Sequence, residues 1–460
     1  MAKQVSTKEK YSFGFGAFGK DMVVGFVGMY LMFYFTDVLG VSAAFVGTLF
    51  FIARIWDATN DPIMGMIIDN TRSKWGKFRP WILAGTLVNS IFFILLFTDF
   101  DLSQTSLYIY VSLIYILWGM SYTMMDVPYW SWLPNLTNDP VEREEVSIVP
   151  RVFASTANLI NGTFGLSFIY FLGTWFSKQE GDQSVGFFTY VLIITLIFIL
   201  TISFTVKNVK EAPTNTGEGI KVRFKDIWRI LFTNKELLAY IGTILCFYLG
   251  AQFLATTLLY YFNYVVGSKS LFALFNALGF MEMVGLIIFP RVAKWITREK
   301  VYPLATGLAV VGLAILFVFG FIAPTSIYPV IVGTAAIKLG FGLITGVITV
   351  SIADVIDYSE VKFGQRNESI ITSTQTFLVK TAMALSGLVI GWSLSLFNYA
   401  PNIEQTEFTK NGIRFLMMGM PVIFILISYF IYKWGYKLKG AFLKDIVQTL
   451  ENRKNREKSV

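Results

Sequence analysis

The composition of the chain narrows its class. It has 460 residues, of which 55% are apolar or aromatic and 15% are charged, and its mean hydropathy is +0.59. Soluble domains carry about 25% charged residues, so a soluble enzyme is not expected. Cys246 is the single cysteine, and histidine is absent, which removes intrachain disulfides, imidazole metal sites and Ser/His/Asp triads. The net charge of +8 does not predict a nucleic-acid-binding face, because the basic residues lie between apolar runs.

Apolar runs of about 20 residues, the length that crosses a bilayer as a helix, recur along the whole chain. The polar first ten residues are not followed by a short cleavable apolar stretch, so no signal peptide is expected. Continuous runs indicate helices rather than the alternating strands of a barrel. The sequence predicts an all-α integral membrane protein with twelve transmembrane helices at 11–36, 43–68, 81–98, 107–133, 150–173, 187–206, 236–262, 271–290, 301–322, 327–358, 369–398 and 412–434.

Lysine and arginine are concentrated in alternate loops, which predicts the orientation. By the positive-inside rule, we expect a multi-pass plasma-membrane protein with both termini in the cytoplasm. The longest polar insert divides the helices six and six. The predicted parts are an N-terminal half (1–206), a central cytoplasmic loop (207–235), a C-terminal half (236–434) and a basic cytoplasmic tail (435–460). The basic loop and tail are interpreted as topology signals or anionic-lipid contacts, and the sequence identifies no regulatory partner.

Two aspartates lie inside the second predicted span. Asp57 and Asp61 are four residues apart, hence on one helical face, with Asn60 one turn from Asp57. A charged group in the bilayer costs about 2.5 to 3.5 kcal/mol, and two close carboxylates repel unless a proton or cation lies between them. Because alkali cations prefer oxygen ligands, we predict a coupling-cation site. The alternative is that both aspartates pair with Arg54 or with basic residues on neighbouring helices.

The predicted span 107–133 carries a polar and aromatic face. Tyr122, Asp126 and Trp130 recur at four-residue steps, and Thr123 precedes Asp126 by three residues. A carboxylate accepts hydroxyl protons while an indole covers an apolar ring face, so this pattern predicts a sugar site. The alternative is an interfacial aromatic belt with one satisfied aspartate, but Asp126 lies too deep in the run for a belt.

Residues 14–19 match GxGxxG and are followed by Lys20 and Asp21. Since no strand precedes the motif, we interpret its glycines as helix-packing residues rather than as a dinucleotide site. Arg151 begins a later span and offers paired donors to a carboxylate or to two hydroxyls. It is predicted to bind sugar; the alternative is that it is the charge partner of Asp21 or Asp126, and the two roles are compatible.

A short basic loop follows the second predicted span. Asp69 lies at the end of that span, and Arg72, Lys77 and Arg79 lie in the loop after it. Ion pairs among them would hold the cytoplasmic side closed and break when it opens, so these residues are predicted to gate transport. The alternative is that the basic residues only anchor the loop in the cytoplasm.

Several longer stretches carry a family resemblance. They are 11–21 (YSFGFGAFGKD), 53–65 (ARIWDATNDPIMG), 71–81 (TRSKWGKFRPW), 118–130, 150–155 (PRVFAS) and 353–358 (ADVIDY), with Glu368, Ser369, Gln375 and Lys380. On these stretches the chain resembles the glycoside-pentoside-hexuronide cation symporters of the major facilitator superfamily, over nearly its whole length. The resemblance implies that superfamily's fold of two six-helix halves, symport of a sugar with Na⁺, Li⁺ or H⁺, and no bound cofactor.

The resemblance also implies residue roles. The matching positions for the cation site are Asp57, Asp61 and Thr123, with Asn60 bearing on cation selectivity. Those for a galactoside site are Lys20, Asp21, Tyr122, Asp126, Trp130 and Arg151. Lys380 matches a lysine that lies between the two sites and ties them together.

Two positions depart from the family pattern. Thr345 stands where the family member that the chain most resembles has a tryptophan, which puts the second-half wall of the sugar site, and so the sugar, in doubt. Thr59 replaces an aliphatic residue beside the cation pair, so the preference among Na⁺, Li⁺ and H⁺ stays open. We predict cation-coupled uptake of a galactoside such as melibiose by alternating access, in which cation and sugar raise each other's affinity.

Two other functions are alternatives. The first is a proton-coupled pentoside or glucuronide carrier of the same family, because a proton can replace a metal ion on desolvated carboxylates. An intramembrane prenyltransferase would hold magnesium diphosphate on the paired acids at 57–61 and 354–357, but no phosphate-clamping loop accompanies them. We therefore expect a transporter rather than an enzyme.

Overall fold

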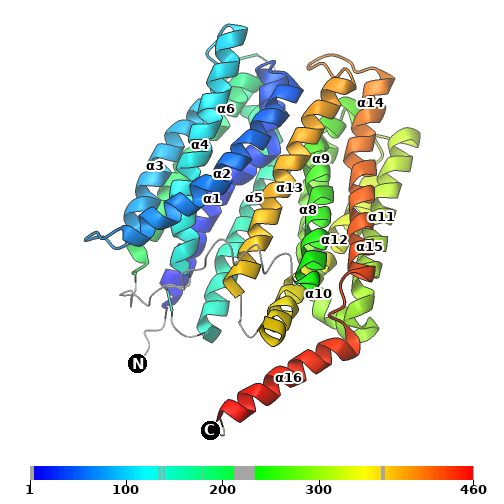
Figure 1. Cartoon of the computed structure of the whole chain (residues 1–460). Coiled ribbons are helices and arrows are strands. Elements are labelled where there is room, and N and C mark those ends of the chain that lie inside the picture. Colours follow the sequence, from blue (N-terminus) through cyan, green and yellow to red (C-terminus); the bar gives the residue numbers. More distant parts are fainter. Residues whose placement is uncertain are drawn as a thin grey trace. The chain divides into compact units, whose positions relative to one another are not determined.

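The computed structural model describes residues 5–133, 136–137, 140–179, 181–211, 234–363 and 368–458, and the regular elements in these ranges are all helices (Figure 1). Of the predicted central loop, residues 212–233 lie outside the described residues. The chain forms two compact units, and each is considered by itself. The first is Met1–Glu218 with Gly391–Glu404, and the second is Gly219–Ile390 with Gln405–Val460.

In the described ranges, the first unit contains six long helices. They are α1 (Thr7–Phe33), continued by the π-helical turn η1 (Tyr34–Val38), α2 (Ala43–Asn70), α3 (Arg79–Leu96), α4 (Gln104–Trp132), α5 (Pro140–Ser177) and α6 (Gln183–Asn208). Local chemistry fixes their starts. The Ser6 side chain accepts the Glu9 N–H while the Glu9 carboxylate accepts the Ser6 N–H, which is a capping box, and Asp182 caps α6.

The glycines of residues 14–19 are packing residues, as predicted. A Cβ built on Gly14 would lie 2.8 Å from Phe153 of α5, and one on Gly19 would lie 1.9 Å from Thr201 of α6. Only glycine lets α1 approach both helices this closely, which confirms the helix-packing interpretation of GxGxxG. A buried aromatic core includes Phe97, at the end of α3, which stacks on Phe187 of α6 with ring centroids 5.9 Å apart.

The first unit also includes residues from late in the chain. Trp392 Nε1 donates to Thr48 Oγ1 over 3.1 Å, and the Tyr399 hydroxyl donates to Asp37 Oδ1 over 2.6 Å. These contacts attach the last turns of α13 (Glu368–Leu396) and the segment after it to α2 and η1. The predicted C-terminal half, 236–434, includes this segment, so the compact units and the predicted halves differ here.

The second unit continues the helical pattern, with two departures from the predicted spans. Its elements are α8 (Lys235–Tyr260), η3 (Tyr261–Val266), α9 (Lys269–Ala277), α10 (Phe280–Ile296), α11 (Arg298–Ile322), α12 (Ile327–Phe363), most of α13, α14 (Glu407–Arg414), η4 (Phe415–Gly419), α15 (Met420–Trp434) and α16 (Gly440–Lys458). The predicted continuous span 271–290 is instead broken between α9 and α10 at Leu278 and Gly279. Much of the predicted tail forms α16, which follows α15 (Figure 1) and packs on α12.

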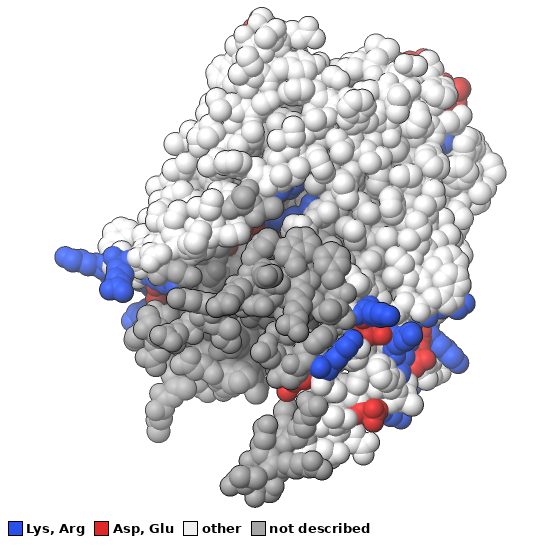
Figure 2. Space-filling model, viewed as in Figure 1, with Lys and Arg blue, Asp and Glu red and all other residues white. Residues whose placement is uncertain are grey.

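The helices have the lengths and composition of membrane spans. In the described ranges, eleven helical segments are long and apolar enough to cross a bilayer. α2 is not one of the eleven and carries Arg54, Asp57 and Asp61, but its 28 residues exceed the roughly 20 that a crossing needs. Over the second unit, Figure 2 shows charged side chains gathered beside α16 below an almost uncharged wall. The predicted all-α membrane architecture is confirmed.

Candidate functional site

Lys20 of α1 lies at the centre of a charged cluster in the first unit. Its side chain is only 3% exposed, and its Nζ lies 2.8 Å from Asp126 Oδ1 of α4 and 3.1 Å from Asp21 Oδ2. Burial of an ammonium group is tolerated when carboxylates compensate its charge. One ammonium faces two carboxylates, whose side chains are 16% and 25% exposed. The carboxylates therefore keep lone pairs that can accept protons from hydroxyl groups.

Aromatic rings surround the same ammonium group. Lys20 Nζ lies 4.9 Å from the centroid of the Trp130 ring and 5.6 Å from that of Tyr129, and it donates to the Tyr122 hydroxyl over 3.4 Å. Trp118 stacks on Tyr122 with centroids 5.7 Å apart. The predicted face of α4 thus lies beside Lys20, with a half-buried indole next to carboxylates. This combination of an apolar plate and acceptors suits a sugar ring.

Tyr129 is a member of this cluster that sequence reasoning missed. Its hydroxyl donates to the carbonyl oxygen of Phe13, and its ring stacks on Phe13 with centroids 4.4 Å apart. Both contacts hold α4 against α1. Tyr129 is not on the helical face that the four-residue spacing of Tyr122, Asp126 and Trp130 defines. It joins the cluster because Lys20 of α1 makes a cation–π contact with its ring.

Arg151 does not pair with either aspartate of the cluster. In the described part of the chain the ion-pair partner of Asp21 and of Asp126 is Lys20, and the Arg151 side chain at the start of the apolar part of α5 is exposed. The structure therefore does not show the charge pairing of Arg151 that was given as the alternative. Its role as a sugar ligand stays a prediction, for which an exposed guanidinium has unused donors.

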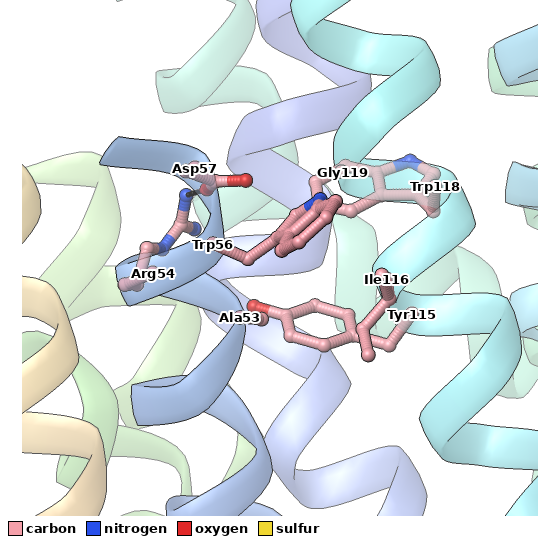
Figure 3. A pocket seen from close by; sticks show the side chains of 8 residues that line it. All are labelled: Ala53, Arg54, Trp56, Asp57, Tyr115, Ile116, Trp118 and Gly119. Carbon is pink, nitrogen blue, oxygen red and sulfur yellow. Dashed lines mark hydrogen bonds and ion pairs between the residues drawn. The ribbon is translucent and has the colours of Figure 1, made fainter. Parts of the chain in front are cut away.

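The α2 aspartates each contact a polar group. Asp57 is 7% exposed, and its Oδ2 accepts from Arg54 Nη1 over 2.9 Å (Figure 3). Asp61 Oδ1 accepts from Thr123 Oγ1 of α4 over 3.0 Å. Asp57 thus pairs with Arg54, as in the alternative to a cation site. A cation that used both carboxylates would therefore have to compete with the guanidinium.

A pocket between α2 and α4 adjoins this pair. Figure 3 shows Arg54 and Asp57 of α2 on one side and Tyr115 and Trp118 of α4 on the other. A Cβ built on Gly119 would lie 3.4 Å from Asp57 Oδ1, so the backbone of α4 passes close to this carboxylate. The predicted cation ligands thus come from two helices that are in direct contact.

Asn60 is the one predicted cation ligand with an unmet polar atom. Its Nδ2 is buried, and no described residue hydrogen-bonds it. A buried amide without a partner costs free energy, which a ligand at this position can recover. Rotating the amide by half a turn presents its oxygen, the atom that an alkali cation binds. The side chain of Thr59 lies outside the described residues.

The residues of the predicted gate contact an acid that sequence reasoning did not include. Glu211, just after α6, accepts from the backbone N–H groups of Lys77, Phe78 and Arg79 at the start of α3, over 2.6, 3.0 and 2.9 Å. The Arg79 guanidinium donates to the carbonyl oxygen of Val209. The side chain of Asp69 lies outside the described residues, and Arg72 is exposed. Sequence reasoning missed Glu211 because more than 130 residues separate it from the loop.

The second unit holds the remaining predicted residues. Thr345 lies on α12 and is half-buried, and Lys380 lies on α13. Asp354 of α12 forms an ion pair with Arg298 and accepts from the Tyr436 hydroxyl over 3.2 Å. Because Asp354 is occupied in this way, it does not offer a free acid for the diphosphate site that a prenyltransferase would need.

Known proteins match the chain over almost its full length. An isoprimeverose transporter of Lactiplantibacillus pentosus is 30% identical over 447 residues, covering 96% of this chain and 92% of that protein. A putative glycoside/cation symporter of Escherichia coli (strain K12), YagG, is 28% identical and covers 97% of this chain and 95% of its own length. A bacterial homologue of the human lysosomal transporter Spinster, in an inward-facing conformation, superposes with a TM-score of 0.67 at 14% identity, over 95% of this chain and 97% of that chain.

The comparisons settle the fold and the family. The Spinster homologue and further transporter structures show that the chain has the major facilitator fold, as predicted. The family described as MFS/sugar transport protein matches residues 12–440. A match of this extent confirms the predicted relationship to the glycoside cation symporters and the expectation of a transporter rather than an enzyme. The chain belongs to the MFS/sugar transport protein family.

Proposed function

We propose that the protein is a plasma-membrane symporter that couples the entry of a monovalent cation to the uptake of a neutral glycoside, with a galactoside such as melibiose as the first candidate. Support comes from the buried Lys20 with its two carboxylates under an indole ring. The names of the relatives agree, since one is an isoprimeverose transporter and another a putative glycoside/cation symporter. We place both termini in the cytoplasm on the distribution of basic residues.

The proposed cation ligands are Asp57, Asn60, Asp61 and Thr123. A bound Na⁺ or Li⁺ would draw the α2 carboxylates together by relieving their repulsion, and would fill the unmet polar position at Asn60. It would also share Asp57 with Arg54, or displace the guanidinium from it. A proton on one carboxylate would neutralise the pair in the same manner, so Li⁺, Na⁺ and H⁺ are all candidates.

Three of the proposed sugar ligands, Tyr122, Asp126 and Trp130, share α4 with the proposed cation ligand Thr123. Asp126 and Asp21 would accept hydroxyl protons, Trp130 would cover the apolar face of the ring, and Arg151 would donate to paired hydroxyls. Tyr122 and Lys20 would complete the polar wall. We propose Thr345 and Lys380 as further contributions from the second unit, on the family resemblance alone. Thr345 cannot stack on a sugar as an aromatic residue would, so its hydroxyl would contribute at most a hydrogen bond.

The proposed transport cycle has two requirements. Cation and sugar must each raise the other's affinity by the same factor, since linkage is reciprocal. The proposed gate, formed by Asp69, Arg72, Lys77 and Arg79, must release its contacts when the cytoplasmic side opens. We propose that the Glu211 cap on α3 is one of those contacts.

The experiment that tests this function is isothermal titration of the purified protein with melibiose, isoprimeverose and methyl glucuronide, each with and without NaCl at fixed pH. We expect a neutral glycoside to bind more tightly with Na⁺. Asp57→Asn should abolish the sodium effect while retaining weak sugar binding, and Asp126→Asn should abolish sugar binding while retaining sodium binding. A wild-type protein that binds only the glucuronide, or no sugar at all, would overturn the proposed function.

A further inference from the structure

The second unit contains an ion pair within its membrane spans that the proposed function does not use. Lys338 Nζ of α12 lies 3.2 Å from Glu282 Oε2 of α10. Both residues belong to segments with the length and composition of bilayer spans, Ile327–Lys362 and Lys269–Ile296. Ionisable residues at such positions are costly and are retained where they have a function or a partner.

The pair lies beside the interruption of its span. Glu282 is the third residue of α10, directly after the break at Leu278 and Gly279. The break is closed by short-range bonds, since the Glu282 N–H donates to the Gly279 carbonyl over 3.1 Å. Broken helices within membranes occur where the backbone is buried in protein or lines a water-filled cavity. The break therefore places a carboxylate where a span departs from regular helix.

The packing of α10 on α12 does not depend on the ion pair. A Cβ built on Gly285 would lie 2.5 Å from the Leu339 carbonyl oxygen, and one on Gly342 would lie 2.1 Å from the Glu282 carbonyl oxygen. The two backbones thus touch through small residues, which is the usual basis of helix association in membranes. A salt bridge is not required to hold helices that already pack this closely.

The pair is also partly accessible. The Glu282 side chain is 41% exposed and that of Lys338 is 22% exposed. Charged groups exposed to hydrocarbon would pay the full insertion cost, so a pair exposed in this way is better accommodated beside water than beside lipid. Lys338 and Thr345 are seven residues apart on α12, which places them on one helical face. The accessible pair therefore shares a face with the position proposed for sugar contact in this unit.

We propose that Glu282 and Lys338 form a hydroxyl-binding site for a neutral glycoside in the second unit, an inference that rests on the proposed function. The carboxylate accepts protons from sugar hydroxyls, and the ammonium group donates to a hydroxyl or ring oxygen. Because Glu282 compensates the charge of Lys338, the pair offers no free cation to a sugar carboxylate. The pair thus selects neutral glycosides over glucuronides.

The test compares sugar affinity in Glu282→Gln, Lys338→Met and the double variant, by titration with melibiose, isoprimeverose and methyl glucuronide in NaCl. Each single variant should raise the dissociation constant of the neutral glycoside by about tenfold or more, the cost of a hydrogen bond to a charged group. Glu282→Gln should also gain affinity for methyl glucuronide, because it releases the charge of Lys338. The double variant should remain impaired, since both contacts are gone.

A matched control comes from the same unit. Glu407 and Lys410 of α14 form an ion pair over 3.3 Å, and Glu407 is 74% exposed. Glu407→Gln should leave all sugar affinities unchanged. If the Glu282–Lys338 pair were only structural, the double variant would regain wild-type sugar affinity, and that result would overturn the inference.

Two further outcomes separate this inference from the proposed function. Wild-type protein that binds a neutral glycoside, loses it in Asp126→Asn, and keeps it in Glu282→Gln and Lys338→Met would overturn the hydroxyl-binding site alone. Wild-type protein that binds none of the neutral glycosides would overturn both. Sodium binding, which the proposal assigns to the first unit, should persist in both variants and shows that they are folded.

Discussion

Thr123 and Asp126 lie three residues apart on α4 and contact two different helices. Thr123 Oγ1 donates to Asp61 of α2 over 3.0 Å. Asp126 Oδ1 lies 2.8 Å from Lys20 Nζ of α1. On α4, less than one helical turn thus separates a proposed cation ligand from a proposed sugar ligand. A shift of α4 would change both contacts together, which gives the proposed coupling a physical basis.

The first prediction concerns this link. Thr123→Ala removes the hydroxyl that contacts Asp61, and a hydrogen bond to a charged group contributes about 1.5 to 3 kcal/mol. We expect sodium affinity to fall by about tenfold or more, and the sodium enhancement of sugar binding to shrink with it. Sugar affinity without sodium should change little, because Asp126 is untouched. Titration calorimetry in both orders of addition measures all three quantities.

Thr123→Ser is the control for that variant, because it keeps the hydroxyl and removes only a methyl group. It should retain sodium affinity close to the wild-type value. Equal sodium affinities in the alanine and wild-type proteins would show that Thr123 is not a cation ligand.

The second prediction concerns the buried ammonium group. Lys20→Met leaves Asp21 and Asp126 facing each other without compensation, and breaking a buried ion pair costs about 3 to 5 kcal/mol. The variant should unfold at a clearly lower temperature in detergent and should bind no sugar. The double variant Lys20→Met with Asp126→Asn should regain much of the stability but none of the sugar affinity.

The contrast between regained stability and lost sugar affinity distinguishes a structural role of Lys20 and Asp126 from a role in sugar binding. If the double variant regained both stability and sugar affinity, Lys20 and Asp126 would serve packing only. Thermal unfolding followed by tryptophan fluorescence, together with sugar titration of the folded fraction, gives the two readings on the same samples.

Helical spacing was enough to predict which residues share a face. The steps from Asp57 to Asp61 and from Tyr122 to Trp130 fix each set on one side of its helix. Spacing does not reveal which helix lies opposite. The position of Lys20 beside Asp126 depends on how α1 packs on α4, which only the folded chain decides.

The break in the span 271–290 and the helix at Gly440–Lys458 could not be predicted from the sequence either. Residues 271–290 are mostly apolar, so hydropathy predicts one continuous span and gives no sign of the break at Gly279. The segment Gly440–Lys458 mixes charges with apolar residues and reads as a polar tail. Its helix is stabilised by packing, in which the Phe442 ring lies 6.1 Å from that of Tyr358 on α12.

The third prediction concerns the cap on α3. The Glu211 carboxylate accepts from three backbone N–H groups at the start of this helix, where a negative charge is also favoured by the helix dipole. Glu211→Ala should destabilise that helix end by about 1 to 2 kcal/mol, as loss of a cap does. Backbone amides at 77–79 should then exchange hydrogen about tenfold faster, measured by mass spectrometry of peptides from this loop.

Asp101→Asn provides a matched control, because it removes an exposed acid from the same unit away from that helix end. It should leave exchange at 77–79 unchanged. Unaltered exchange in Glu211→Ala would show that the carboxylate does not hold the loop, and its proposed part in gating would fall.

The fourth prediction concerns Lys439, which follows the last span. Partial burial lowers the pKa of Lys439 to about 8, although nearby Glu299 and Glu236 oppose this effect. Its Nζ donates to the Tyr432 carbonyl over 2.7 Å and lies 3.9 Å from the centroid of the Tyr432 ring. Between pH 8 and about 10.4 the unfolded chain therefore binds more protons at this residue than the folded chain, so stability should rise with pH in that window.

Lys439→Arg isolates this contribution, because arginine stays charged throughout the window. As pH increases from 7 to 9.5, the wild-type protein should gain stability relative to the arginine variant, and the gain should begin near pH 8. Other titrating groups are common to both proteins and cancel in the difference. Thermal unfolding of both proteins at half-unit pH steps measures it. A difference that stayed constant, or that favoured the arginine variant at high pH, would mean that Lys439 remains charged in the folded protein.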